Sequence, residues 1–193
     1  MKPLPPLLVS LSASLLLSIP HSPLHAEDPV TLPDLTGAAT SPLDPGDKKA
    51  VVLFFISPYC PTSNTFGPAM KEIAEAFGDD FAFFSVHSDT SVSDQDRATH
   101  AQMMEITHPV LQDGEQALAK KLGATITPEA FVIDADGTVL YQGRINDLYL
   151  GPTQKQQEAT THDLKEALEA IRAGNDVAVP KTEAVGCDLV LAE

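Results

Sequence analysis

Two cysteines, Cys60 and Cys187, carry the most reactive chemistry that this sequence offers. Cys60 lies between a continuous apolar run at 51–56, typical of a buried strand, and Pro61, where a helix is predicted to begin. Free N–H groups and the helix dipole at such a position stabilise a thiolate, which lowers the thiol pKa. The position therefore favours a nucleophile that attacks sulfur or peroxide oxygen. A buried structural thiol or a static disulfide partner would fit the same position.

The segments around Cys60 alternate between strand and helix patterns. We expect, in chain order, an edge strand near 30–32, a strand at 51–56, a helix at 61–77, a strand at 81–86, a helix at 94–105, an extended piece at 109–111, a helix at 115–122 and a hairpin at 127–141 that turns at Asp136-Gly137. A final helix is predicted to begin with a capping box, Thr160 and Asp163, and to end at Gly174. This order predicts an α/β layer fold whose central mixed sheet is parallel at first and antiparallel at the hairpin.

The ends of the chain differ from its middle. Residues 1–26 have a basic start, a short apolar core and a small residue before an acidic pair, which predicts a cleaved signal peptide and a periplasmic or secreted protein. An N-terminal membrane anchor is the alternative, but the apolar run is short for stable membrane insertion. The remaining chain divides into a lead-in at 27–49, one domain at 50–174, and a tail at 175–193 that is expected to be irregular.

Charge and ligand chemistry exclude several classes of function. The net charge of −15 opposes binding to phosphate backbones, so we expect no nucleic-acid partner. Closely spaced Cys or His pairs typical of zinc sites are absent from the sequence. His100, His108 and the pair Met103-Met104 would suit copper, but methionines on a helix more often belong to a core. The sequence therefore predicts neither a metal nor a cofactor.

Two segments carry a resemblance to a known superfamily. Val51–Ser63 is similar to the active-site segment of thioredoxin-like proteins, in which an apolar strand leads into a Cys-x-x-Cys helix start. Ile126–Asp134 resembles the second motif of that superfamily, a Thr-Pro peptide, usually cis, followed by a strand. The resemblance covers roughly residues 30–173 and extends to the redoxin branch, which includes thiol peroxidases. It implies a thioredoxin-like fold in which Pro128 packs beside Cys60.

The sequence also departs from the thioredoxin pattern. Ser63 stands where the resemblance expects a second, resolving cysteine, so Cys60 lacks a near partner and Cys187 becomes the candidate resolver. A purely structural bond between the two cysteines is the alternative. Ser57 could supply the hydroxyl that thiol peroxidases place before the cysteine, but Leu53 stands where their proline is expected.

Two charged residues are candidates for supporting roles. Arg144, after the hairpin, could hold a thiolate or a peroxide oxygen, or could instead be a surface arginine paired with Asp147. Glu129, directly after the Thr-Pro peptide, could carry a proton to or from the thiol.

Three functions remain open at this point. The first is an exported thiol–disulfide oxidoreductase acting on protein thiols or disulfides, with Cys60 as nucleophile, Cys187 as resolver and an unknown reducing partner. The second is a thiol peroxidase in which peroxide oxidises Cys60 to sulfenic acid. The third is a thioredoxin-fold binding module whose disulfide is static.

Overall fold

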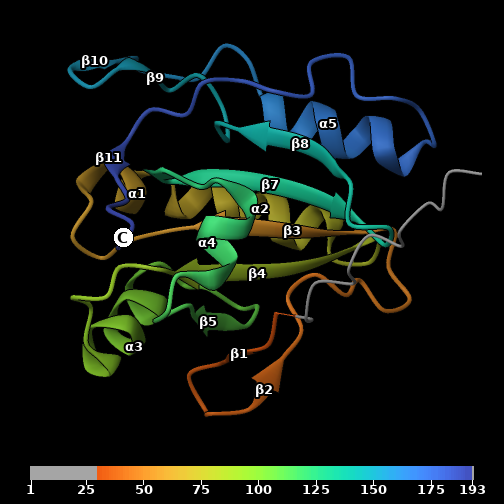
Figure 1. Cartoon of the computed structure of the whole chain (residues 1–193). Helices are drawn as coiled ribbons and strands as arrows, with labels where there is room; N and C mark the ends of the chain where they lie inside the picture. The colour runs from red at the N-terminus through yellow and green to blue at the C-terminus, as the bar shows by residue number, and fades with distance from the viewer. Residues whose placement is uncertain (1–29, 193) are drawn as a thin grey trace, which may run out of the picture.

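The computed structural model describes residues 30–192 of the 193-residue chain, so the predicted signal peptide lies outside the described residues. A five-stranded mixed sheet forms the centre of the molecule (Figure 1). Its strands, in spatial order, are β5 (Val110–Gln112), β4 (Phe81–His87), β3 (Ala50–Phe55), β7 (Glu129–Asp134) and β8 (Val139–Gly143). β3, β4 and β5 run parallel, whereas β7 is antiparallel to both β3 and β8. This is the thioredoxin-like topology that the sequence predicts.

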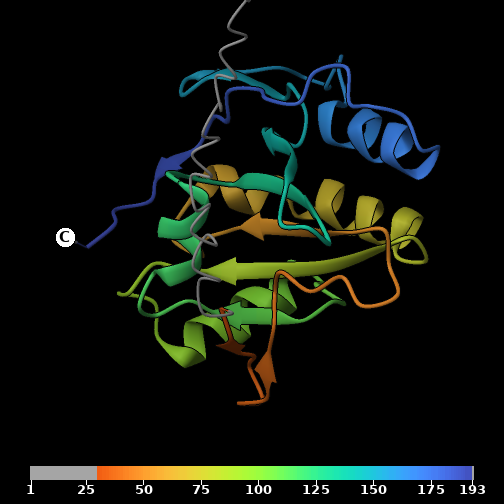
Figure 2. The ribbon, with the colours of Figure 1, turned by 45° about the vertical axis from the view of Figure 1, so that its right-hand side comes forward.

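Every residue of β3 is buried, because helices or loops cover both faces of the sheet. Successive side chains of a strand point to opposite faces. Val52 and Phe54 therefore pack in the cluster formed with α2 (Gly67–Phe77) and α5 (Asp163–Arg172). Leu53 and Phe55 pack in a second cluster with α4 (Ala117–Leu122) and part of the C-terminal tail. Figure 2 shows the strands stacked one above another, with β3 between β4 and β7.

The helix expected at 61–77 is divided into α1 (Pro61–Thr65) and α2, with Phe66 between them. Pro68 causes the break, because it has no N–H to donate to the carbonyl four residues earlier. The Phe66 N–H instead bonds to the Ser63 carbonyl at 3.1 Å, and the Phe66 side chain is buried in the core. α1 is therefore a short helix of its own, with Cys60 as its N-cap.

The expected capping box at the start of α5 is wrong. His162 precedes the helix and makes no side-chain capping bond, while the Thr160 N–H donates to Asp147 at 2.6 Å. The Thr160 hydroxyl also bonds to the Asp147 carboxylate. These bonds, first among them the Thr160 hydroxyl, lower the pKa of Asp147. The predicted end is confirmed, because Gly174 follows α5 with φ of +76° and begins the reversal of the chain.

The expectation of an irregular tail is also wrong in part. Its last described residues contain β11 (Cys187–Asp188), which pairs antiparallel with β6 (Ile126–Thr127). Farther upstream, the tail runs beside the outer edge of β8, where the Gln142 N–H donates to the Pro180 carbonyl and the Thr182 N–H to the Gln142 carbonyl, each at 2.9 Å. The tail thus crosses the sheet edge and reaches the end of β3 that carries Cys60 (Figure 1).

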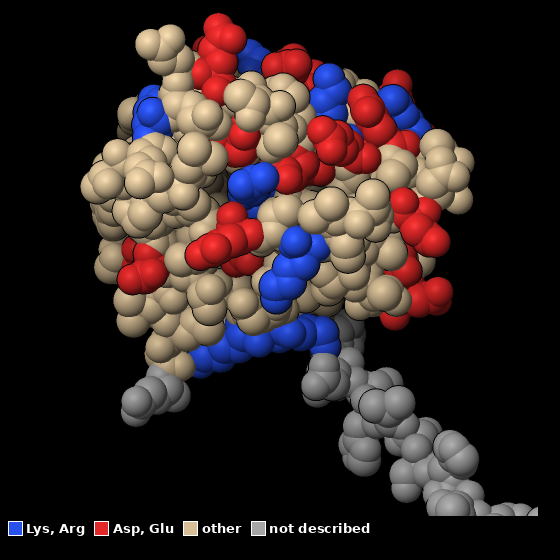
Figure 3. All heavy atoms as spheres, turned by 90° about the horizontal axis from the view of Figure 1, so that it is seen from above, with Lys and Arg blue, Asp and Glu red and all other residues tan. Residues whose placement is uncertain are grey.

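The remaining elements lie at the periphery. They are the pair β1 (Leu32–Pro33) and β2 (Ala39–Thr40), helix α3 (Asp94–Met103), and the pair β9 (Tyr149–Gly151) and β10 (Gln154–Lys155). Acidic side chains are spread in several separate groups over the face shown in Figure 3, with Lys and Arg among them. Within residues 30–192, no helix has the length and apolar character needed to cross a membrane.

Candidate redox site

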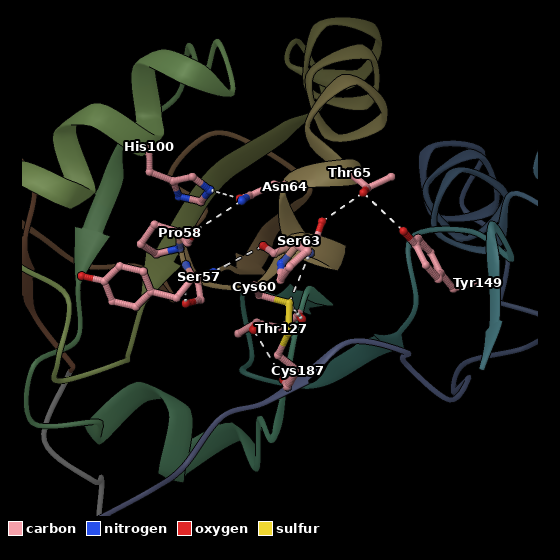
Figure 4. The surroundings of a disulfide bond; sticks show 12 residues. Ser57, Pro58, Cys60, Ser63, Asn64, Thr65, His100, Thr127, Tyr149 and Cys187 are labelled. Carbon is pink, nitrogen blue, oxygen red and sulfur yellow. Dashed lines mark hydrogen bonds between the residues drawn. A yellow bond between two sulfur atoms is a disulfide. The ribbon is translucent and has the colours of Figure 1, made fainter. Parts of the chain in front are cut away.

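Cys60 and Cys187 form a disulfide, although 127 positions separate them in the sequence (Figure 4). Their Cα atoms lie 5.8 Å apart, within the normal range for such a bond. Cys60 is almost completely buried, with 1% of its surface exposed, while Cys187 is partly exposed. The structure therefore brings together the two cysteines that the sequence singled out.

Cys60 occupies the N-cap of α1, as its place between a strand and Pro61 predicts. The Ser63 N–H points at the Cys60 Sγ atom from 3.4 Å, and the Thr127 carbonyl oxygen lies 3.0 Å from the same atom. The N–H would stabilise a thiolate, whereas the carbonyl would accept a hydrogen bond from the protonated thiol. In reduced Cys60, the Ser63 N–H would therefore favour the thiolate, and the Thr127 carbonyl would favour the protonated thiol.

Ser63, in the position of a resolving cysteine, has a structural role. It is fully buried, and its hydroxyl accepts a hydrogen bond of 3.3 Å from the Ser57 N–H. The Ser57 hydroxyl in turn accepts from the Tyr59 N–H at 3.3 Å. The two hydroxyls therefore fix the loop that leads from β3 to Cys60.

Helix α3 holds the same loop from the other side. Tyr59 donates its hydroxyl to Asp96 at 2.9 Å. Asn64 donates its amide to the Pro58 carbonyl at 3.2 Å, and its Oδ1 atom lies 2.8 Å from His100 Nε2 (Figure 4). The loop before Cys60 is consequently linked to α3 at two points.

His100 and His87 form a buried pair behind this loop. Because the Asn64 oxygen can only accept, His100 carries its proton on Nε2 and accepts at Nδ1. The His87 Nε2 atom, 3.4 Å from His100 Nδ1, is then the donor of that contact. Burial, with smaller contributions from the His100 ring and the nearby Arg97 charge, lowers the pKa of His87 to about 3, and burial lowers that of His100 to about 4. Both rings are therefore neutral at neutral pH.

The Thr127–Pro128 peptide bond is cis, as the resemblance to thioredoxin-like proteins implies. Thr127 takes part in the site with its main chain and its side chain. Its carbonyl contacts Cys60, and its hydroxyl donates to the Cys187 carbonyl at 3.4 Å. The segment before Pro128 therefore touches both members of the disulfide.

Glu129 is buried at the start of β7, and both of its carboxylate oxygens have partners. One accepts from the Thr125 N–H at 3.3 Å and the other from the Gln142 amide at 2.9 Å. These bonds connect β7 with β8 and with the chain before β6. The Glu129 carboxylate therefore has a structural role in holding these segments together.

The Arg144 side chain pairs with Asp163 at the start of α5. Its Nε and Nη2 atoms donate to the two carboxylate oxygens of Asp163 at 2.8 and 3.0 Å, and this pairing raises the pKa of the guanidinium. The expected pairing with Asp147 is wrong, because Asp147 bonds to Thr160 and its neighbour instead. In the disulfide form, Arg144 therefore stabilises the hairpin against α5 and does not hold sulfur.

Two tail residues that sequence reasoning missed position Cys187. Thr182 anchors the tail through its hydroxyl, which accepts from the Arg144 N–H at 3.0 Å and lies 2.8 Å from the Tyr141 hydroxyl. At Gly186, a Cβ atom would lie 2.1 Å from the Thr127 carbonyl oxygen, so only glycine allows this close approach. A glycine directly before a redox cysteine is a signal that the sequence contains and that could have indicated the approach.

A cavity of about 440 Å³ opens beside the disulfide. Its lining includes both cysteines, Tyr59 and Gln116. Gln116 is another residue that the sequence does not single out, because its role depends on the tail. Within residues 30–192, no group of three or more His, Cys, Asp or Glu side chains is arranged to hold a metal ion.

A thioredoxin-like fold with a disulfide at the N-terminus of a helix and beside a cis-proline defines a class of thiol redox proteins. The model of the AhpC/TSA family matches residues 25–142, which is more than half of the chain. The chain therefore belongs to the AhpC/TSA family of redoxins. No curated protein matches it.

Solved structures share the fold at low sequence identity. A hypothetical protein from Sinorhizobium meliloti is 24% identical with a TM-score of 0.71, over 84% of this chain and 91% of that one. A secreted disulfide oxidoreductase from Mycobacterium tuberculosis is 19% identical with a TM-score of 0.55, over 74% and 96%. A peroxidoxin from the same organism is 22% identical with a TM-score of 0.53, over 75% and 92%. These similarities confirm the fold.

Proposed function

We propose that this protein is an exported thiol–disulfide oxidoreductase in which Cys60 is the nucleophile and Cys187 the resolving cysteine. The observation that carries the proposal is the disulfide itself, which joins the buried N-cap cysteine of α1 to a cysteine on a short, docked tail strand. A reactive cysteine and a second cysteine within reach are the two parts that disulfide exchange requires.

The reaction begins with both cysteines reduced. The Cys60 thiolate attacks one sulfur of a substrate disulfide, the substrate S–S bond breaks, and the other substrate sulfur leaves and takes up a proton. The Cys187 thiolate then attacks the Cys60 sulfur, which releases the second substrate thiol and forms the Cys60–Cys187 bond. Two electrons pass from the protein to the substrate, and a separate dithiol must reduce the protein again.

The anchor at Thr182 makes Cys187 an efficient resolver. The bonds of Thr182 to Tyr141 and Arg144 involve neither cysteine, so we expect them to persist when the disulfide is reduced. The free tether is therefore only residues 183–187, which span at most ~18 Å when extended. Because this tether is short, the local concentration of Cys187 around Cys60 is roughly millimolar.

Export is proposed from the predicted signal peptide and is supported by the chemistry of the pair. Disulfides persist in oxidising compartments and are rare in the reducing cytosol. Sequencing the N-terminus of protein recovered from the cell envelope or the medium tests this. A mature chain beginning near residue 27 is expected, and an intact N-terminus would contradict cleavage.

Membership in the AhpC/TSA family favours a second candidate, a thiol peroxidase. In that reaction Cys60 attacks a peroxide oxygen, the O–O bond breaks with release of water or an alcohol, and Cys187 condenses with the sulfenic acid to give the same disulfide and water. The engagement of Arg144 with Asp163 argues against it, because the Arg144 guanidinium is then not available to hold a peroxide oxygen at Cys60.

One set of assays separates these functions. Wild type, Cys60→Ser and Cys187→Ser are compared for reduction of a protein disulfide and for consumption of hydrogen peroxide, each with dithiothreitol as reductant. We expect disulfide reduction to be lost in Cys60→Ser. Pre-reduced Cys187→Ser, mixed with the substrate after removal of dithiothreitol, is expected to accumulate a mixed disulfide detectable by mass. Peroxide turnover that depends on Cys60 would support the peroxidase. Inactivity of a correctly folded wild type in both assays would refute both and leave a binding module.

A further inference from the structure

The tail beyond Cys187 lies extended in a groove next to the disulfide. Its first residues bond to the chain around β6, with Cys187 in register with Thr127 and the Leu189 N–H donating to the Thr125 carbonyl at 2.7 Å. Main-chain bonds of this kind do not depend on side-chain identity. The groove can therefore hold other extended chains that place a cysteine opposite Thr127.

Gln116 extends this recognition further along the tail. Its buried amide nitrogen donates to the Val190 carbonyl at 2.9 Å and to the Ser88 carbonyl at 2.8 Å, while its amide oxygen accepts from the Ala192 N–H at 2.6 Å. Gln116 is 1% exposed and adopts a left-handed conformation with φ of +58°. One fixed side chain thus binds both a carbonyl and an N–H of an extended backbone, three and five positions after the cysteine.

One tail side chain is selected for its chemistry. Leu189 is 7% exposed and belongs to the same apolar cluster as Leu118 and Ala124. Its neighbours Asp188 and Val190 are exposed. The groove therefore accepts any residue directly after the cysteine, but requires an apolar residue two positions after it.

We propose that this groove is the binding site for an extended segment of a protein substrate with the pattern cysteine, any residue, leucine or a similar apolar residue, and that the tail is its internal occupant. The proposal rests on the proposed function and specifies the substrate of the same site. In the reduced protein the tail is released from Cys60, and the substrate segment takes its place with its cysteine sulfur opposite Cys60.

The chemistry follows the exchange already described. Cys60 attacks the substrate cysteine that lies in the groove, and the partner sulfur of that cysteine leaves as a thiol. The anchored tail then returns strand against strand, and Cys187 attacks the Cys60 sulfur as the substrate segment is displaced. Because tail and substrate compete for one groove, weakening the docked tail increases reaction with substrate.

Two peptides test the selection of leucine. One has the sequence of residues 184–192, and the other has serine in place of the leucine that corresponds to Leu189. In both, the cysteine is carried as a mixed disulfide with thionitrobenzoate, whose release is followed by absorbance. With the Cys187→Ser protein, we expect the leucine peptide to react ~10-fold faster or more, which corresponds to burial of one leucine side chain.

Protein variants locate the effect in the groove. In the Cys187→Ser background, Leu189→Ser weakens the docked tail and is expected to raise the leucine-peptide rate several-fold relative to the rate with dithiobis(nitrobenzoate). Gln116→Asn, which tolerates the left-handed backbone but is one methylene shorter, is added to the Leu189→Ser variant, in which the tail competes less; there it is expected to lower that ratio several-fold. Gln95→Asn, at an exposed position of α3, is the matched control and should leave it unchanged. Circular dichroism confirms that each variant is folded.

The outcomes distinguish failure of this proposal from failure of the proposed function. If Cys60 reacts with dithiobis(nitrobenzoate) but the two peptides react at equal rates, the groove proposal is overturned and the nucleophile stands. If Cys60 reacts neither with dithiobis(nitrobenzoate) nor with either peptide, the proposed function fails as well. A disulfide-linked dimer as the main oxidised form of wild type would assign the groove to the tail of a second copy, and would also overturn the proposal.

Discussion

Gly186→Ala provides the sharpest test of how the tail holds Cys187. A Cβ atom at this position would lie 2.1 Å from the Thr127 carbonyl oxygen and 2.7 Å from its carbonyl carbon. These are main-chain atoms of β6, so they cannot turn aside as the end of a flexible side chain could. The tail must therefore move outward, away from the position in which Cys187 meets Cys60.

The size of the effect follows from the cost of overpacking. Forcing an added methyl group into a packed contact costs about 1–3 kcal/mol. The cost falls on the oxidised form, because the reduced tail is free to move away. For a two-electron couple 1.4 kcal/mol corresponds to about 30 mV, so the reduction potential of the pair should rise by roughly 20–65 mV.

The potential is measured by equilibrating the protein in glutathione buffers of different ratios, trapping free thiols and quantifying both forms by mass. Gly114→Ala is the matched control, because a Cβ atom there meets nothing within 4 Å. A shift in Gly186→Ala no larger than that of the control would refute the claim that this close approach seats the tail.

Two further predictions concern the residues around the site. Because the rings of His87 and His100 are neutral when folded and take up protons when unfolded, stability is full above about pH 6.5 and falls as the pH decreases, by about 3 kcal/mol at pH 4 for His87 alone. Urea unfolding at several pH values should show a shallower acid decline in His87→Leu, and parallel profiles would contradict the assignment. Ser63→Cys places a thiol one helical turn from Cys60, so a local disulfide should compete with Cys187. Peptide mapping of the oxidised variant detects it, and exclusive pairing with Cys187 would show that the buried site cannot accommodate the local bond.

Much of the fold could be predicted from local patterns. The fully apolar run of β3 indicates burial on both faces, because no polar alternation marks a solvent side. The turn residues at Gly137 and Gly174 mark the ends of elements, because a left-handed backbone favours glycine. Pro68, which divides the expected helix, was also visible in the sequence, but its effect depends on whether the surrounding segment packs as one helix or two.

The residues of the site also divide into those that local sequence patterns predict and those that only tertiary contacts place. By itself, the sequence determined that Cys60 stands at a strand–helix junction and that Ser63 cannot resolve its mixed disulfides, because each follows from residue types within a short stretch. The place of the Thr-Pro peptide beside Cys60 was implied by the resemblance to thioredoxin-like proteins. Only the tertiary structure decided that Arg144 turns to Asp163, and that a tail anchored beside β8 delivers Cys187 to Cys60. These contacts join segments far apart in the chain, and their geometry is set by main-chain hydrogen bonds and close approach rather than by a local pattern of side chains.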